Sequence, residues 1–146
     1  MTNTSAILTV AEAESIVERA LEFRRAQGLS PMTVAVLDLG GHPILVKRED
    51  ACGFLRVDIA IGKAKGALGF MLSSRALAER ALQLPSFMAA VASLSDGGVI
   101  PAAGGVLLTD EVSGTVVGAV GVSGDTSDND EACIAAALEH TRFARV

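Results

Sequence analysis

Apolar residues near the start of the chain recur every three or four positions, which is the period of an amphipathic helix. This stripe consists of Ala13, Ile16, Val17, Ala20 and Leu21. Thr9 and Glu12 have the spacing of a capping box, and Gly28 is a typical residue just beyond a helix end. The pattern therefore predicts a helix that opens at Thr9 and continues to about Gln27.

The next two apolar segments, residues 32–38 and 43–49, change to the two-residue alternation of strands. They are joined by Leu-Gly-Gly-His, residues 39–42, and a glycine pair at such a point permits positive φ. We therefore expect a β-hairpin. In its second strand, alternation places Arg48 and Glu49 on opposite faces.

The rest of the chain predicts helices over residues 55–69 and 74–84, with further helix after Pro85, and then glycine-punctuated, valine-rich segments. Strands are expected near 98–100, 105–109 and 115–122, and a last helix with an acidic start runs to about Arg142. The order α-β-β-α-α-β-β-β-α, with short turns between consecutive strands, favours an antiparallel sheet flanked by helices. We expect one α+β domain over residues 1–146. Glycines 118, 121 and 124 are expected to let a helix, a ligand or another subunit approach the strand backbone, and close packing alone is enough to explain them.

Composition and charge exclude several classes of function. The 146 residues carry a net charge of −5, which is unfavourable for general nucleic-acid binding. No apolar segment is long enough to span a bilayer, and the first residues lack the basic start of a secretory signal. Two cysteines make no disulfide framework. We therefore expect no nucleic-acid or membrane partner and a reduced, cytoplasmic setting.

Candidate chemistry centres on His42, which follows the glycine pair. An imidazole there is able to exchange a proton near neutral pH or to bind iron, and the alternative is that it only caps backbone groups at the turn. Lys63 and Lys65 lie in AIGKAKGA, where a lysine is able to offer its ammonium to a carboxylate ligand. For at least one of the two, a solvated helix surface is the simpler interpretation. Arg56 is a further candidate anion partner.

Metal and nucleophile sites have little support. Cys133 and His140 share a helix face but lie two turns apart, roughly 10 Å along the axis, so a dedicated Cys/His zinc site within one subunit is not expected. GGVIPAAGG lacks the spacing and the lysine of a phosphate-binding loop. No Ser-His-Asp or Cys-His nucleophile can be assembled with specificity.

Three segments, VLDLGGHPILVKREDA, AIGKAKGA and GGVLLTDEVSGTVVGAVGVSGDTSDNDEACIAAAL, together resemble the GlcG/HbpS-like family, which also occurs as the C-terminal domain of PduO-type proteins. The likeness covers nearly the whole chain in the family's order. It implies a profilin-like five-stranded antiparallel sheet, homo-oligomers from tetramer to octamer, and haem binding or haem degradation. On this resemblance His42 is the candidate iron ligand, and Lys63 or Arg56 would meet the propionates.

The residues leave two other functions open. In a cofactor-free isomerase, tautomerase or lyase of a catabolic pathway, His42 would exchange a proton with Glu49 or Asp38, while Arg48 or Lys63 would hold a carboxylate or enolate. A non-catalytic accessory or sensory module would instead depend on its oligomer surfaces. Both ligand-dependent functions require that His42 opens onto a hollow that a small molecule is able to enter.

Overall fold

The computed structural model describes residues 7–95 and 98–145. Its elements in chain order are α1 (Val10–Ala26), β1 (Thr33–Asp38), β2 (Pro43–Arg48), α2 (Leu55–Phe70), α3 (Ser74–Gln83), α4 (Pro85–Leu94), β3 (Gly105–Asp110), β4 (Val116–Ser123), α5 (Ser127–Leu138) and β5 (Phe143–Arg145). As predicted, α1 begins with a capping box in which the Thr9 hydroxyl accepts the Glu12 N–H at 3.1 Å.

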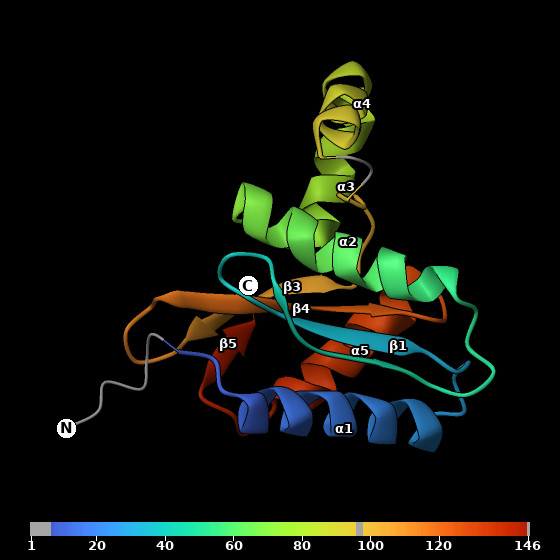
Figure 1. Cartoon of the computed structure of the whole chain (residues 1–146), viewed down its shortest axis with the longest axis vertical. Coiled ribbons are helices and arrows are strands. Elements are labelled where there is room, and N and C mark those ends of the chain that lie inside the picture. Colours follow the sequence, from blue (N-terminus) through green and yellow to red (C-terminus); the bar gives the residue numbers. More distant parts are fainter. Residues whose placement is uncertain (1–6, 96–97, 146) are drawn as a thin grey trace.

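The five strands form one sheet in the order β2-β1-β4-β3-β5, and every neighbouring pair is antiparallel. Helices α1 and α5 cover one face, α2 covers the other, and α3 and α4 extend away from the α2 side (Figure 1). This is the single α+β domain with a five-stranded antiparallel sheet that the sequence predicts.

One strand lies elsewhere than expected. Residues 98–100 form no strand, because this segment runs along α2, where the Ile100 N–H donates to the Gly62 carbonyl at 3.1 Å. The fifth strand is β5, which pairs with the end of β3. The predicted last helix also ends early, at Leu138, because Glu139 is extended and His140 adopts a positive φ of 61°.

The two faces of the sheet are packed differently. The face under α1 and α5 holds the larger cluster of branched side chains, whereas the α2 face is lined mainly by alanine and glycine. A side chain at Gly121 would run into the Ala60 carbonyl, and one at Gly105 would run into the Lys63 carbonyl. Helix α2 therefore lies close against β3 and β4. The expected close approach at Gly121 is confirmed, and side chains at Gly118 and Gly124 would likewise meet the backbones of Leu37 and Pro31.

Candidate functional site

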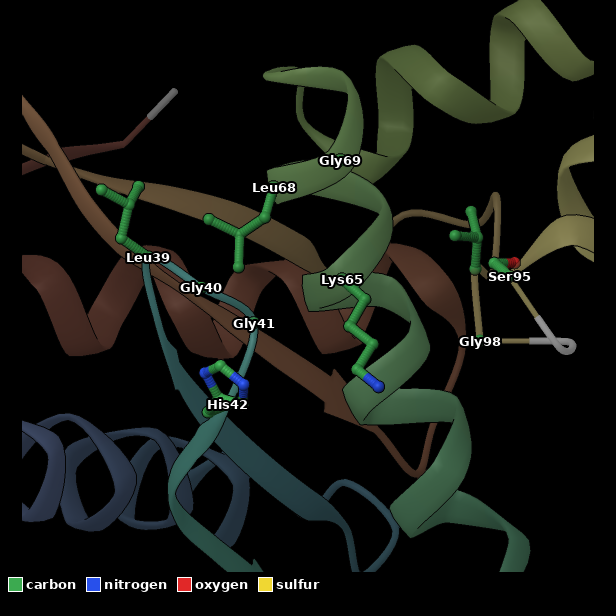
Figure 2. Close-up of a pocket in the computed structure, with 10 residues that line it drawn as sticks. Leu39, Gly40, Gly41, His42, Lys65, Leu68, Gly69, Ser95 and Gly98 are labelled. Atoms are coloured by element: carbon green, nitrogen blue, oxygen red, sulfur yellow. The ribbon is translucent and has the colours of Figure 1, made fainter.

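His42 opens onto a hollow, which is the condition that the ligand-dependent functions require. Its side chain is 80% exposed, and the hollow of about 460 Å³ lies between the hairpin turn and α2 (Figure 2). The lining residues are Leu39, Gly40, Gly41, His42, Lys65, Leu68, Gly69, Ser95, Gly98 and Val99. The turn, the C-terminal half of α2 and the segment after α4 thus meet at one place.

The Asp38 carboxylate builds the turn that carries the imidazole. Its Oδ1 accepts the backbone N–H groups of Gly40 and His42, each at 2.9 Å, and lies 3.4 Å from His42 Nδ1. The hydrogen bond from the His42 N–H is the main reason that the pKa of Asp38 lies below its usual range. Gly41 has a φ of 82°, and a side chain at Gly40 would come within 2.9 Å of the imidazole. The ring therefore has a carboxylate beside one nitrogen, and Nε2 remains for a ligand.

Helix α2 contributes Lys65 and Leu68 to the hollow, although the sequence pattern indicates no definite role for Lys65. The Lys65 side chain is exposed, and its ammonium has no salt-bridge partner within the described parts of the chain. Residues two positions apart in a helix are separated by about 200° around its axis, so Lys63 and Lys65 face in nearly opposite directions. This spacing was the available signal that only one of the two lysines could reach a given site.

Lys63 does not present its ammonium to the hollow, contrary to the expectation for a ligand-binding cation. Its side chain is 3% exposed, and Nζ donates to Asp130 Oδ2 and to the Val122 carbonyl, both at 3.0 Å. Burial raises the pKa of Asp130, and the Asp125 N–H and the Lys63 ammonium oppose that rise. Lys63 therefore meets a carboxylate, but this carboxylate belongs to the protein's own α5.

Glu49 and Arg48 lie at the other end of β2 and line a separate hollow of about 380 Å³. The Glu49 carboxylate accepts Arg24 Nε at 2.8 Å, a second Arg24 nitrogen at 2.6 Å, and the Met32 N–H at 3.1 Å. Burial acts to raise the pKa of Glu49, but these hydrogen bonds outweigh it and the pKa lies below its usual range. The structure thus separates Glu49 and Arg48 from His42, with which the acid–base hypothesis had grouped them.

Arg56 is also placed away from the candidate site. One of its guanidinium nitrogens donates to the Ser123 hydroxyl at 3.1 Å, which joins the start of α2 to the end of β4. It is not among the residues that line the His42 hollow. Of the predicted site residues, the structure therefore brings together His42 and Asp38, and it adds Lys65.

The described residues define a class of small α+β domains with an antiparallel sheet and an accessible imidazole above a hairpin turn. Residues 8–139 match the family described as haem degrading protein HbpS-like. The match covers most of the chain, so this protein belongs to the HbpS-like family.

Several known proteins are similar to this chain. A PduOC:heme complex has a TM-score of 0.83 at 20% identity, over 94% of this chain and 97% of that one, and at this identity the likeness shows the fold. A double mutant of HbpS from Streptomyces reticuli has a TM-score of 0.77 at 29% identity, over 94% and 88% of the two chains. An uncharacterized 15.0 kDa protein in the dhaT-dhaS intergenic region of Citrobacter freundii is 27% identical over 134 residues, which is 92% of each chain.

Two features are absent from the described residues. Within them, no three His, Cys, Asp or Glu side chains gather where they could hold a metal ion. No helix in these ranges combines the length and the apolar composition that crossing a bilayer requires.

Proposed function

We propose that this protein binds haem in the hollow beside the hairpin turn, with His42 as the ligand of the haem iron. The observation that carries the proposal is an imidazole that is 80% exposed, opens onto a hollow of about 460 Å³, and has a carboxylate 3.4 Å from its Nδ1. Membership of the HbpS-like family and the fold shared with a PduOC:heme complex support it.

The lining of the hollow fits such a group. Leu39, Leu68 and Val99 supply apolar walls, and glycines at the turn and along α2 leave room for a flat ring to approach the backbone. The volume falls within the usual range for small-molecule sites, roughly 300–1,000 Å³. Figure 2 shows that the turn with His42 and the helix with Lys65 bound the same space.

Three side chains have distinct roles in this proposal. His42 would bind the iron through Nε2, because Asp38 lies beside Nδ1. A carboxylate beside the second nitrogen of a metal-binding histidine fixes its tautomer and raises its basicity, so Asp38 is a positioning residue. The exposed Lys65 ammonium would meet a propionate. When bound, haem supplies an iron centre whose reactivity depends on its axial ligand and on the polarity around it.

Titration of the purified protein with hemin tests the proposal. We expect the Soret band to shift on binding, and we expect His42→Ala to abolish the shift characteristic of histidine ligation. His140→Ala is the matched control, because His140 is the other histidine of the chain and lines a different hollow. If hemin produces no Soret shift, or the same shift with His42→Ala as with the unaltered protein, the proposal is wrong.

Haem degradation is the finer part of the proposal, and it is supported by the family description. The same spectra distinguish it from binding alone. When ascorbate is added in air to the haem-loaded protein, degradation removes the Soret band and releases iron, whereas binding alone leaves the band in place. If the Soret band is lost no faster than the band of free hemin under the same conditions, the function is limited to binding.

A second candidate is haem-free acid–base catalysis, because Asp38 and His42 lie side by side at an open hollow. Asp38 would orient the imidazole, His42 would move the proton, and Lys65 would attract a substrate carboxylate. The test is deuterium exchange at the carbon beside the carbonyl of small keto acids, followed by NMR with haem-free protein. Exchange that is absent, or equal in His42→Ala, would remove this candidate.

A further inference from the structure

Basic side chains gather around the hollow of about 380 Å³ between the end of α1 and the end of β2, which we call the basic hollow. Its lining contains four of the chain's 12 lysines and arginines, although the chain as a whole carries a net charge of −5. The lining residues are Arg24, Arg25, Lys47, Arg48, Glu49 and Asp50. None of them lines the hollow beside His42, so the basic hollow is a separate place on the molecule.

One carboxylate holds the inner wall of the basic hollow in place. Glu49 is 10% exposed and pairs with two nitrogens of Arg24, whose guanidinium also donates to the Leu29 carbonyl at 3.2 Å. The Arg25 Nε lies 3.7 Å from the same Glu49 oxygen that Arg24 contacts at 2.6 Å. Glu49 is therefore shared between two guanidinium groups, and it neutralises only one of their charges.

The outer side chains keep positive charge that the protein does not neutralise. Arg48 is exposed and has no salt-bridge partner within the described parts of the chain, and the Arg25 side chain is 49% exposed. Lys47 pairs with Glu18 at 3.3 Å, and the lining holds one further carboxylate, Asp50. Even with Glu18 included, the carboxylates are fewer than the cations, so the basic hollow keeps a net positive charge.

The end of α1 accounts for only part of this charge. Arg24 and Arg25 lie in the last turn of the helix, where basic side chains interact favourably with the negative end of the helix dipole. Lys47 and Arg48 lie on β2, and a strand has no comparable dipole. Because cations from two different elements converge on one hollow, an anionic ligand explains the arrangement better than helix capping does.

We infer that the basic hollow binds a small molecule that carries a phosphate group. A guanidinium offers paired N–H donors in one plane, which match two phosphate oxygens, and Arg48 and Arg25 have exposed side chains for such contacts. Arg24, held by Glu49, would add positive charge behind them. The volume suits a small molecule, for which sites of roughly 300–1,000 Å³ are usual. The inference goes beyond haem binding and does not depend on it, because the two hollows share no residue.

Isothermal titration calorimetry of the haem-free protein with pyrophosphate at low salt tests the inference. We expect saturable binding, and we expect Arg48→Gln to weaken it about tenfold or more, because charge-assisted hydrogen bonds are lost. Arg80→Gln is the matched control: Arg80 is exposed on α3, has no salt-bridge partner among the described residues and lies outside the lining. It removes the same charge elsewhere and should change the affinity less than twofold.

Two further measurements separate a phosphate site from general attraction of anions. Arg48→Lys keeps the charge but not the paired donors, so it should restore only part of the affinity. Citrate, a carboxylate anion of comparable charge, should bind more weakly than pyrophosphate. Both Arg48 variants should leave the circular dichroism spectrum unchanged, because Arg48 is exposed. Absence of pyrophosphate binding, equal losses in Arg48→Gln and Arg80→Gln, full affinity in Arg48→Lys, or citrate binding as tight as that of pyrophosphate would each overturn the inference.

Discussion

Two lysines of α2 lie in contrasting surroundings. The Lys63 ammonium is buried against the sheet, whereas the Lys65 ammonium is exposed at the hollow. Both lysines lie on α2, two residues apart, yet Lys63 is 3% exposed and bonded to Asp130, whereas Lys65 is in contact with solvent. Lys63 thereby links α2 on one face of the sheet to α5 on the other. The comparison shows that packing, rather than residue type, decides which charge is paired inside the fold and which stays exposed.

The carboxylates divide in the same way. Asp130 is 1% exposed and Glu49 is 10% exposed, and each is bonded to a cation of the protein. Asp38, in contrast, is 46% exposed and lies beside the His42 imidazole at the hollow. Substitutions in the first group should therefore act on stability, and substitutions in the second should act on ligand binding.

The largest effect is expected for Lys63→Met, which leaves the Asp130 carboxylate buried without its cation. Breaking a buried pair by removing one partner typically costs about 3–5 kcal/mol. We therefore expect the free energy of unfolding in urea to fall by about that amount. Lys63→Met combined with Asp130→Leu should recover much of the loss, because no charge then remains buried.

Lys65→Met is the matched control for this experiment, since it removes the same charge two residues away at an exposed position. Its unfolding free energy should change by no more than about 0.5 kcal/mol. Equal losses for Lys63→Met and Lys65→Met would contradict the division of the two lysines described above.

A smaller effect is expected when the pH is lowered, through Glu49. Its pKa lies below the usual value of 4.5, so its contribution to stability is fully present above 4.5 and is lost as the pH falls through the lower value in the folded state. Between about pH 6 and pH 3, Glu49→Gln should therefore lose less stability than the unaltered protein does. Urea denaturation at several pH values measures both slopes, with Asp50→Asn as the exposed neighbouring control. Parallel slopes for Glu49→Gln and the unaltered protein would contradict the prediction.

The parts of the fold that the sequence predicted depend on local chemistry. The capping box at Thr9, the hairpin at the glycine pair and the glycine-punctuated strands each require only neighbouring residues. β5 was missed because it has three residues, Phe143–Arg145, which are too few to show an alternation. Residues 98–100 were misassigned because their backbone bonds to α2, and a single sequence does not encode that contact as a pattern.

The candidate site was predicted in part for the same reason. His42 follows a turn signal, so its exposure at the end of the hairpin could be expected. The partners of Lys63 and Glu49 could not, because Asp130 lies 67 residues from Lys63 and Arg24 lies 25 residues from Glu49. Such pairs arise only when helices are packed on the sheet, and no spacing rule identifies them.

The smallest effect is expected for Lys65→Met at the hollow, and it tests the other side of the comparison. An exposed ion pair contributes about 0.2–1 kcal/mol, so the affinity for hemin should fall by roughly 1.4- to fivefold. The Soret position should stay unchanged, because the proposed iron ligand, His42, is still present. The difference should shrink at high salt, since the charges are exposed. Lys47→Met is the control: Lys47 is exposed on β2 and pairs with Glu18 at 3.3 Å, away from the hollow. If Lys47→Met and Lys65→Met weaken hemin binding equally, the Lys65 ammonium acts only through the overall charge of the protein and not as a contact in the site.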